Sequence, residues 1–305
     1  MRIKPFFLTI LICLSAVSAQ ARKPLFGGPK TIAVDANGNI PGTVASGVMG
    51  QTGYLSGAKK VAVPLVAVAF ESSAKARTSH GGRDSITTKS LDLTLRVDNA
   101  VLQSIANELQ AIVERDLVAQ GFEILPKESI DTDARFTAIA KEASTGEETK
   151  DNFMSGFMGN GVMNRWFTAG SRPLFGTGFT GALGETGPLI HIAREKKFSI
   201  LFYRFKVQFT DIEASNGIVF NYVKGKNDLH MLSADISVFT PEHTLGGTVK
   251  LNDNITMGSD YVQDLQTRSK GVYTVVADPD RFKADSLKLI SAVSKQLAQA
   301  LRKAQ

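Results

Sequence analysis

The four histidines are the side chains most able to do chemistry near neutral pH, because a neutral imidazole binds metals and accepts protons. They are His80, His191, His230 and His243. No two have the spacing that would place them on one helix turn to share a metal, and neither His-Glu-x-x-His nor Gly-x-Ser-x-Gly occurs. His230 falls in an expected strand, where we interpret it as a sheet residue. The sequence therefore predicts no catalytic residue and no metal, although a triad assembled from distant segments stays open.

Two carboxylate pairs could also carry chemistry, Asp131 with Asp133 and Asp278 with Asp280. Paired carboxylates divide acid and base roles or bind a cation. Each pair, however, lies where a helix is expected to begin, and carboxylates there accept hydrogen bonds from free backbone N–H groups. We therefore predict that both pairs cap helices.

A polar segment from Glu71 to Ser85 gathers basic side chains around Gly81-Gly82. These are Lys75, Arg77 and Arg83, with His80 among them. We expect a loop here, which either forms a small anion site for phosphate or an acidic glycan, or is simply solvated.

Spaced glycines occur at Gly176-Thr-Gly-Phe-Thr-Gly181, matching the pattern that lets a backbone approach a pyrophosphate at a helix start. No strand is expected before this motif, and Gly184 and Gly187-Pro188 disfavour a helix after it. We therefore predict no nicotinamide cofactor, and no other cofactor is indicated.

The motif lies in a glycine-rich and aromatic segment, residues 151–188. Its aromatic residues are Phe153, Phe157, Trp166, Phe167, Phe175 and Phe179. Glycine leaves the backbone free to rearrange, while aromatic rings supply contact area. We expect an irregular insert, which either contacts a membrane, a hydrophobic ligand or another protomer, or completes the core.

The elements that must position these residues start with a buried strand at Lys60–Phe70, a nearly unbroken apolar run. Pro64 has no donor, which predicts a bulge or an edge position there. A half-buried strand follows, in which Leu91, Leu93, Leu95 and Val97 alternate with polar residues.

Apolar residues at spacings of three and four predict a helix from Asp98 to Gly121, then a short strand and a weaker helix at Ser129–Ala143. The last third predicts a meander of antiparallel strands and a closing helix at Asp280–Lys303, whose apolar stripe covers the sheet. The expected strands are Phe198–Thr210, Ile218–Val223, Leu229–Phe239 and Thr248–Ile255. Together these elements predict one α/β (α+β mixed) domain with a mixed sheet over residues 58–305.

The amino terminus predicts export. Arg2 and Lys4 precede the apolar run Phe6–Val17 and the site Ala19-Gln20-Ala21, the order of a signal peptide over residues 1–21. Its cleavage would remove Cys13, the one cysteine, and lower the formal net charge from +6 to +4. No basic block of the kind that binds nucleic acid occurs. Residues 22–57, rich in glycine, proline, serine and threonine, predict an extended or partly disordered lead-in.

The segments Val97–Leu109 and Gln120–Pro126 resemble a family of bacterial envelope lobes. This family includes the curli secretion channel, the outer-membrane activators of penicillin-binding proteins and the TolB amino-terminal domain. The shared pattern is an early hydrophobic strand, an amphipathic helix, a glycine-aromatic turn and a short strand, then a meander and a closing helix. It covers about half of the chain, and residues 151–188 have no counterpart. The resemblance implies a non-catalytic module that binds or helps assemble another protein.

We therefore expect a periplasmic or secreted, non-enzymatic interaction module of the envelope. Its partner would be an envelope protein or a membrane surface, with a homo-oligomer as a further alternative. A second hypothesis is a carrier or sensor of a hydrophobic ligand, with the 151–188 insert as its lid. A third is a hydrolase whose site is scattered along the chain.

Overall fold

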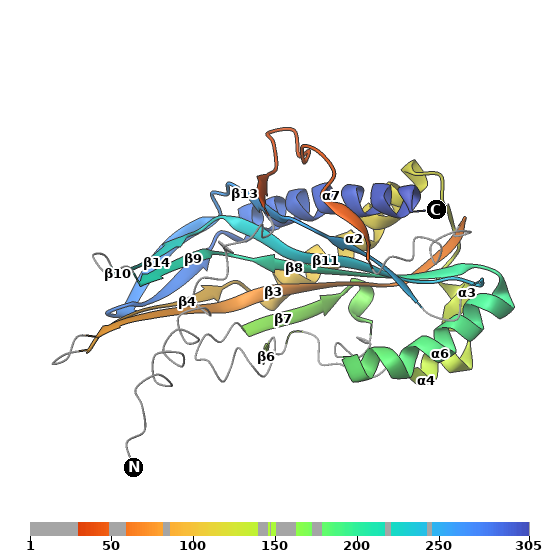
Figure 1. Cartoon of the computed structure of the whole chain (residues 1–305), viewed down its shortest axis with the longest axis horizontal. Coiled ribbons are helices and arrows are strands. Elements are labelled where there is room, and N and C mark those ends of the chain that lie inside the picture. The colour runs from red at the N-terminus through yellow and green to blue at the C-terminus, as the bar shows by residue number, and fades with distance from the viewer. Residues whose placement is uncertain are drawn as a thin grey trace, which may run out of the picture.

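The computed structural model describes residues 30–48, 59–81, 86–139, 146, 148–150, 163–172, 179–216, 221–242 and 246–304. The predicted signal peptide lies outside these residues. Within them, the chain forms a mixed α/β fold with one thirteen-stranded sheet, helices on both of its faces and a separate two-stranded sheet (Figure 1). The predicted fold class is confirmed.

The centre of the large sheet is β3 (Lys60–Gly81), whose residues Val61–Phe70 are all buried. It pairs in parallel with β8 (Ser199–Gln208), and in antiparallel with β7 (Met163–Thr168) and β4 (Ile86–Arg96). The main path of the sheet runs β1-β13-β11-β8-β3-β4-β15-β14. The remaining strands of that path are β1 (Thr31–Ala33), β13 (Asn254–Met257), β11 (Leu229–Phe239), β15 (Val272–Ala277) and β14 (Val262–Ser269). Two short strands, β5 (Glu123–Ile124) and β6 (Glu148–Lys150), pair with β3 and β7.

The bulge predicted at Pro64 is confirmed. The pairing of β3 with β8 changes register between Ala62 and Leu65. The carbonyl groups released there accept hydrogen bonds from side chains, Val63 from Gln110 at 3.1 Å and Pro64 from Arg172 at 2.7 Å. The strand therefore stays buried with its irregular backbone satisfied.

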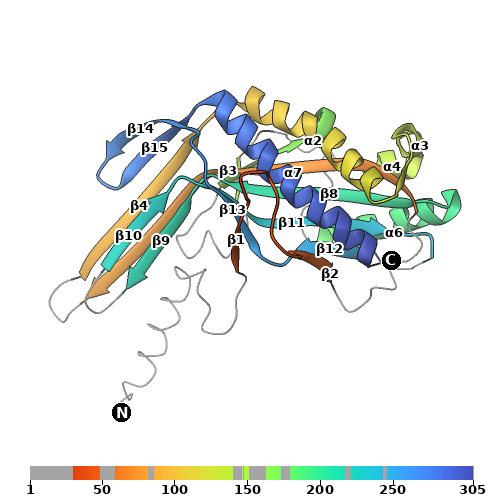
Figure 2. The ribbon, with the colours of Figure 1, turned by 90° about the horizontal axis from the view of Figure 1, so that it is seen from above.

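Alternate residues of β3 face two separate cores. Val66, Val68 and Phe70 belong to the larger one, beneath α2 (Asn99–Ala119) and α7 (Pro279–Lys303), which lie side by side over one face (Figure 2). Leu65 and Ala67 belong to a smaller core on the opposite face. That face is covered near one end by α3 (Glu128–Asp131), α4 (Ala134–Ile139) and α6 (Phe179–Lys196), while the 3-10 turn η3 (Ala169–Ser171) follows β7.

The polar loop predicted from Glu71 to Ser85 is wrong over most of its length, because β3 continues to Gly81. These polar residues form a strand because β4 pairs with them in an antiparallel ladder from Ser73 to Gly81. Ala74 and Ala76, which lie among them, are buried. Alongside lies the hairpin of β9 (Asp211–Asn216) and β10 (Asn221–Lys226), which contacts both strands. The two hairpins project together away from the helices (Figure 2).

The lead-in predicted for residues 22–57 is ordered into the fold where it is described. Strand β1 pairs in parallel with β13, and β2 (Ala45–Val48) pairs with β12 (Gly247–Leu251). Ile40 and Val44 are buried in the larger core. The segment is rich in turn-forming residues, but it is ordered because the sheet edge provides hydrogen-bond partners for its backbone and α7 packs against it.

Three further boundaries need correction. The strand predicted at Thr248–Ile255 is split into β12 and β13, both paired with β11. The helix predicted at Ser129–Ala143 is broken into α3 and α4. The 151–188 insert, predicted to be irregular, contributes β7 and the first half of α6, and the second half of that helix buries Leu189, Ile190 and Ile192. Burial against the sheet outweighs the poor helix propensity of Gly184 and Pro188.

Candidate functional site

An open pocket of about 510 Å³ lies between α4 and α6, and we name it the α4–α6 groove. Most of its lining is apolar, with two cationic or titratable side chains among it. The lining residues are Ala138, Ile139, Gly187, Pro188, Arg135 and His191. Gly187 and Pro188 present little side-chain bulk on α6, so the space between the two helices stays open.

The helix break at Asp133 sets the position of one wall. The Asp133 carboxylate accepts a hydrogen bond from the backbone N–H of Arg135 at 3.0 Å, and its carbonyl accepts one from the N–H of Thr137. This is helix capping, so a new helix begins where a continuous one was expected. The break turns α4 toward α6 and places Ala138 and Ile139 in the groove.

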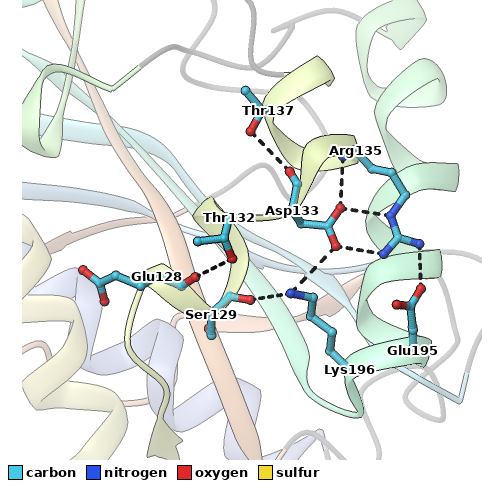
Figure 3. A network of polar contacts seen from close by, with 8 residues as sticks. All are labelled: Glu128, Ser129, Thr132, Asp133, Arg135, Thr137, Glu195 and Lys196. Atoms are coloured by element: carbon cyan, nitrogen blue, oxygen red, sulfur yellow. Dashed lines mark hydrogen bonds and ion pairs between the residues drawn. The ribbon is translucent and has the colours of Figure 1, made fainter.

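A network of charged side chains fastens α4 to α6 (Figure 3). The Arg135 guanidinium donates to Asp133 at 2.8 Å and to Glu195 of α6 at 2.9 Å. Lys196 lies 3.8 Å from Asp133 and donates to the Ser129 carbonyl at 2.8 Å. Three segments, α3, α4 and the end of α6, are thereby held together at the groove.

The hydrogen bond from the Arg135 side chain lowers the pKa of Asp133 from 3.8 to about 2, with further contributions from the Arg135 backbone N–H and the Lys196 charge. The same interactions with Asp133 and Glu195 raise the pKa of Arg135. Both groups are therefore ionised across the physiological range. They act as a fixed ion pair and not as a proton donor and acceptor.

The lining chemistry suits the binding of an apolar group. Among the described residues that line it there is one histidine, His191, and no serine, threonine, cysteine or carboxylate residue. The Arg135 charge is already shared between two carboxylates. The groove can therefore take up an apolar group, with the imidazole of His191 available at its rim for a hydrogen bond.

The predicted histidines and carboxylates separate in space. His191 lines the groove, whereas His230 is buried in β11, and the side chains of His80 and His243 lie outside the described residues. Capping is confirmed for Asp133 and for Asp278, which accepts from the N–H of Arg281 at 3.0 Å. It is wrong for Asp131, which ends α3 and pairs with Arg172. Asp280 lies in the first turn of α7.

Of the three basic residues predicted around an anion loop, the structure places the side chain of Lys75 alone. Lys75 lies on β3, and its ammonium is 3.5 Å from the Asp92 carboxylate on β4. Arg77 also belongs to β3, but its side chain lies outside the described residues, as does the whole of Arg83.

The aromatic residues of the 151–188 segment divide into two groups. Phe167 on β7 is 2% exposed and packs its ring against Phe70 with centroids 6.1 Å apart, so it completes the core. Trp166 is half-buried and packs against the smaller core. Phe153, Phe157 and Phe175 lie outside the described residues, as does the side chain of Phe179, the first residue of α6.

Sequence reasoning missed the groove because it assigned no helix to the residues of α6, Phe179–Lys196. A usable signal was present in Leu189, Ile190, Ile192 and Ala193, all of which are buried in the smaller core. These apolar residues directly follow Pro188. Their spacing is typical of the buried side of a helix that contains this proline.

Comparisons with known proteins give no relative: no family model, no curated protein and no solved structure matches this chain. Among the described residues, no group of three or more histidine, cysteine, aspartate or glutamate side chains is placed to hold a metal ion. None of the helices in those residues has the length and apolar character needed to cross a membrane.

Proposed function

We propose that this protein is a non-enzymatic interaction module of the cell envelope, which holds an apolar segment of a partner protein in the α4–α6 groove. The observation that carries the proposal is the groove's composition: an open, largely apolar surface beside charges that already neutralise one another. The predicted signal peptide and the resemblance to envelope lobes favour the location.

The groove has the size and lining to bind one or two apolar side chains. Burying a leucine or phenylalanine side chain from water is worth about 1.5–3 kcal/mol, so two anchors give a modest, reversible affinity. The ion pairs linking α4 and α6 keep the walls in place before the partner arrives, which reduces the entropy lost on binding. These features fit recognition of a short apolar segment.

Photo-crosslinking in the native envelope tests the proposal. Ala138 is exposed in the groove wall, and Ala111 is exposed on α2 on the opposite side of the sheet, so the two positions form a matched pair. With p-benzoylphenylalanine at position 138, we expect a protein adduct of discrete mass, and none from position 111. Equal adducts from both positions, or none from either, contradict the proposal.

A carrier of hydrophobic molecules is the second candidate, because the same apolar lining would accept an acyl chain. The crosslinking separates the two, since a carrier yields a lipid adduct at position 138 by mass spectrometry. A second experiment places the crosslinking residue at position 139 and adds Ala138→Trp, whose ring fills the groove. This change should abolish the adduct, whether protein or lipid, whereas Ala111→Trp should leave it unchanged.

A further inference from the structure

Strand β14 is an edge strand of the large sheet, and its outer edge is open in the part of the chain that the structure describes. It pairs with β15 on one side only, so its other side presents backbone N–H and C=O groups without a ladder partner. Its side chains are mostly exposed, and Leu265 is 49% exposed, one of two large apolar residues exposed in the part of the chain that the structure describes. Such an edge is a site for strand addition.

The charges along β14 are self-complementary. The Asp264 carboxylate accepts a hydrogen bond from Gln266 at 3.0 Å, and Arg268 donates to Thr274, the residue opposite Gln266, at 3.2 Å. These contacts place Asp264, Gln266 and Arg268 on one face of the strand. In an antiparallel pair of two β14 strands centred on Gln266, Asp264 of each copy lies opposite Arg268 of the other.

We propose that two copies of this chain pair through β14, antiparallel about a two-fold axis at Gln266, so that their large sheets join into one. The pairing places two oppositely charged pairs on one face, and Leu265 beside Thr267 of the second copy on the other. Register shifts between Val262 and Asp264 and between Thr267 and Ser269 restrict regular pairing to the strand centre. The contact is therefore short, and the dimer is weak and reversible.

The dimer leaves the α4–α6 groove open, because α4 and α6 lie at the other end of the sheet from β14 (Figures 1 and 2). This inference is therefore independent of the proposed function, and either can fail alone.

Sedimentation velocity of the mature protein over a range of concentrations, with charge-swapped variants, tests the pairing. Asp264→Arg places two arginines opposite each other, and Arg268→Asp places two aspartates, so each variant alone should dimerise at least about tenfold more weakly. A mixture of the two variants restores both opposite-charge pairs and should form a heterodimer. The double variant should dimerise like the parent.

A parent that stays monomeric overturns the proposal, as does a mixture that dimerises no better than its components. Far-UV circular dichroism checks that each variant is folded. If a charge variant unfolds, Gln266→Cys replaces it as the test, because the two cysteines face each other across the axis and a short bismaleimide should link them. Ala111→Cys on α2 is the matched control, and equal linkage of the two variants also overturns the proposal.

Discussion

Asp133 shows how one side chain sets both local structure and the site. It caps α4, pairs with Arg135 and attracts Lys196 from α6. Its side chain is 8% exposed, whereas that of Arg135 is 39% exposed, so water screens part of the attraction. The lowered pKa of Asp133 makes its contribution to folding depend on pH.

Asp133→Asn should lower the free energy of unfolding by about 1 kcal/mol at neutral pH, because the asparagine keeps a capping oxygen but loses the charge. The pKa of Asp133 is about 2 in the folded protein against 3.8 ordinarily, so its stabilisation is complete above about pH 4 and is lost as the pH falls toward 2. Urea denaturation at neutral pH and near pH 3 measures the difference, which should shrink in acid.

The matched control is Asp98→Asn. Asp98 occupies the N-cap position of α2, is exposed and makes no capping hydrogen bond through its side chain. It should change stability little at either pH. A loss for Asp98→Asn as large as that for Asp133→Asn would mean that general charge effects, and not the Asp133 network, stabilise the fold.

At the scale of elements, the turn that joins β14 to β15 depends on one glycine. Gly271 has a φ of +79°, and its carbonyl accepts a hydrogen bond from the Asp92 N–H at 2.7 Å. A Cβ atom at this position would lie 2.5 Å from the Ser90 carbonyl oxygen. The turn thus approaches β4 closely enough to fix β15 against it.

Gly271→Ala should lower the free energy of unfolding by about 3 kcal/mol, combining the positive φ with the clash against the β4 backbone. Gly42→Ala is the control, because Gly42 has a φ of +81° with no atom within 4 Å of the added Cβ. We expect it to cost about 1 kcal/mol. Chemical denaturation compares them, and equal losses would show that the contact with Ser90 relaxes freely.

The sequence predicted those elements whose pattern is strong within a single segment. The Lys60–Phe70 run, the alternation from Leu91 to Val97 and the amphipathic period of α2 and α7 each identify an element before any partner is known. Polar strands such as the end of β3 and most of β14 exist because a neighbour completes their ladder, which local sequence does not record. Strand β15 is different, because Tyr273 and its valine neighbours are residue types typical of a strand.

The candidate site was less predictable than the fold. The α4–α6 groove requires a helix break at Asp133, which the Asp133 cap sets, and a helix that includes Pro188, which depends on burial of the residues after it against the sheet. The sequence marks Asp133 as a helix cap and His191 as a reactive side chain, but the groove residues Ala138 and Ile139 carry no chemical signal. A binding surface made of small apolar side chains becomes visible when the two helices are placed together.

At the scale of the whole molecule, residues 30–48 join distant parts of the chain. They add β1 and β2 to the sheet, bury Ile40 and Val44, and accept hydrogen bonds from α7. Lys288 donates to the Ala36 carbonyl at 2.9 Å, and Gln296 donates to that of Ile40 at 3.4 Å. The start of the described chain is thereby fastened along the last helix, so it should unfold together with the rest.

Val44→Ala tests this cooperativity. Val44 is fully buried, so its truncation should lower the free energy of unfolding by about 2 kcal/mol. Trp166, the single tryptophan, lies on β7 and reports unfolding at a distant part of the sheet. If the molecule is one cooperative unit, tryptophan fluorescence and far-UV circular dichroism should shift to the same new midpoint. The neighbouring exposed substitution Thr43→Ala removes only a long hydrogen bond from Lys303, at 3.5 Å, and should shift both midpoints little. A Trp166 transition unchanged by Val44→Ala would show that residues 30–48 are an independent strap, because the core around β7 would then unfold without them.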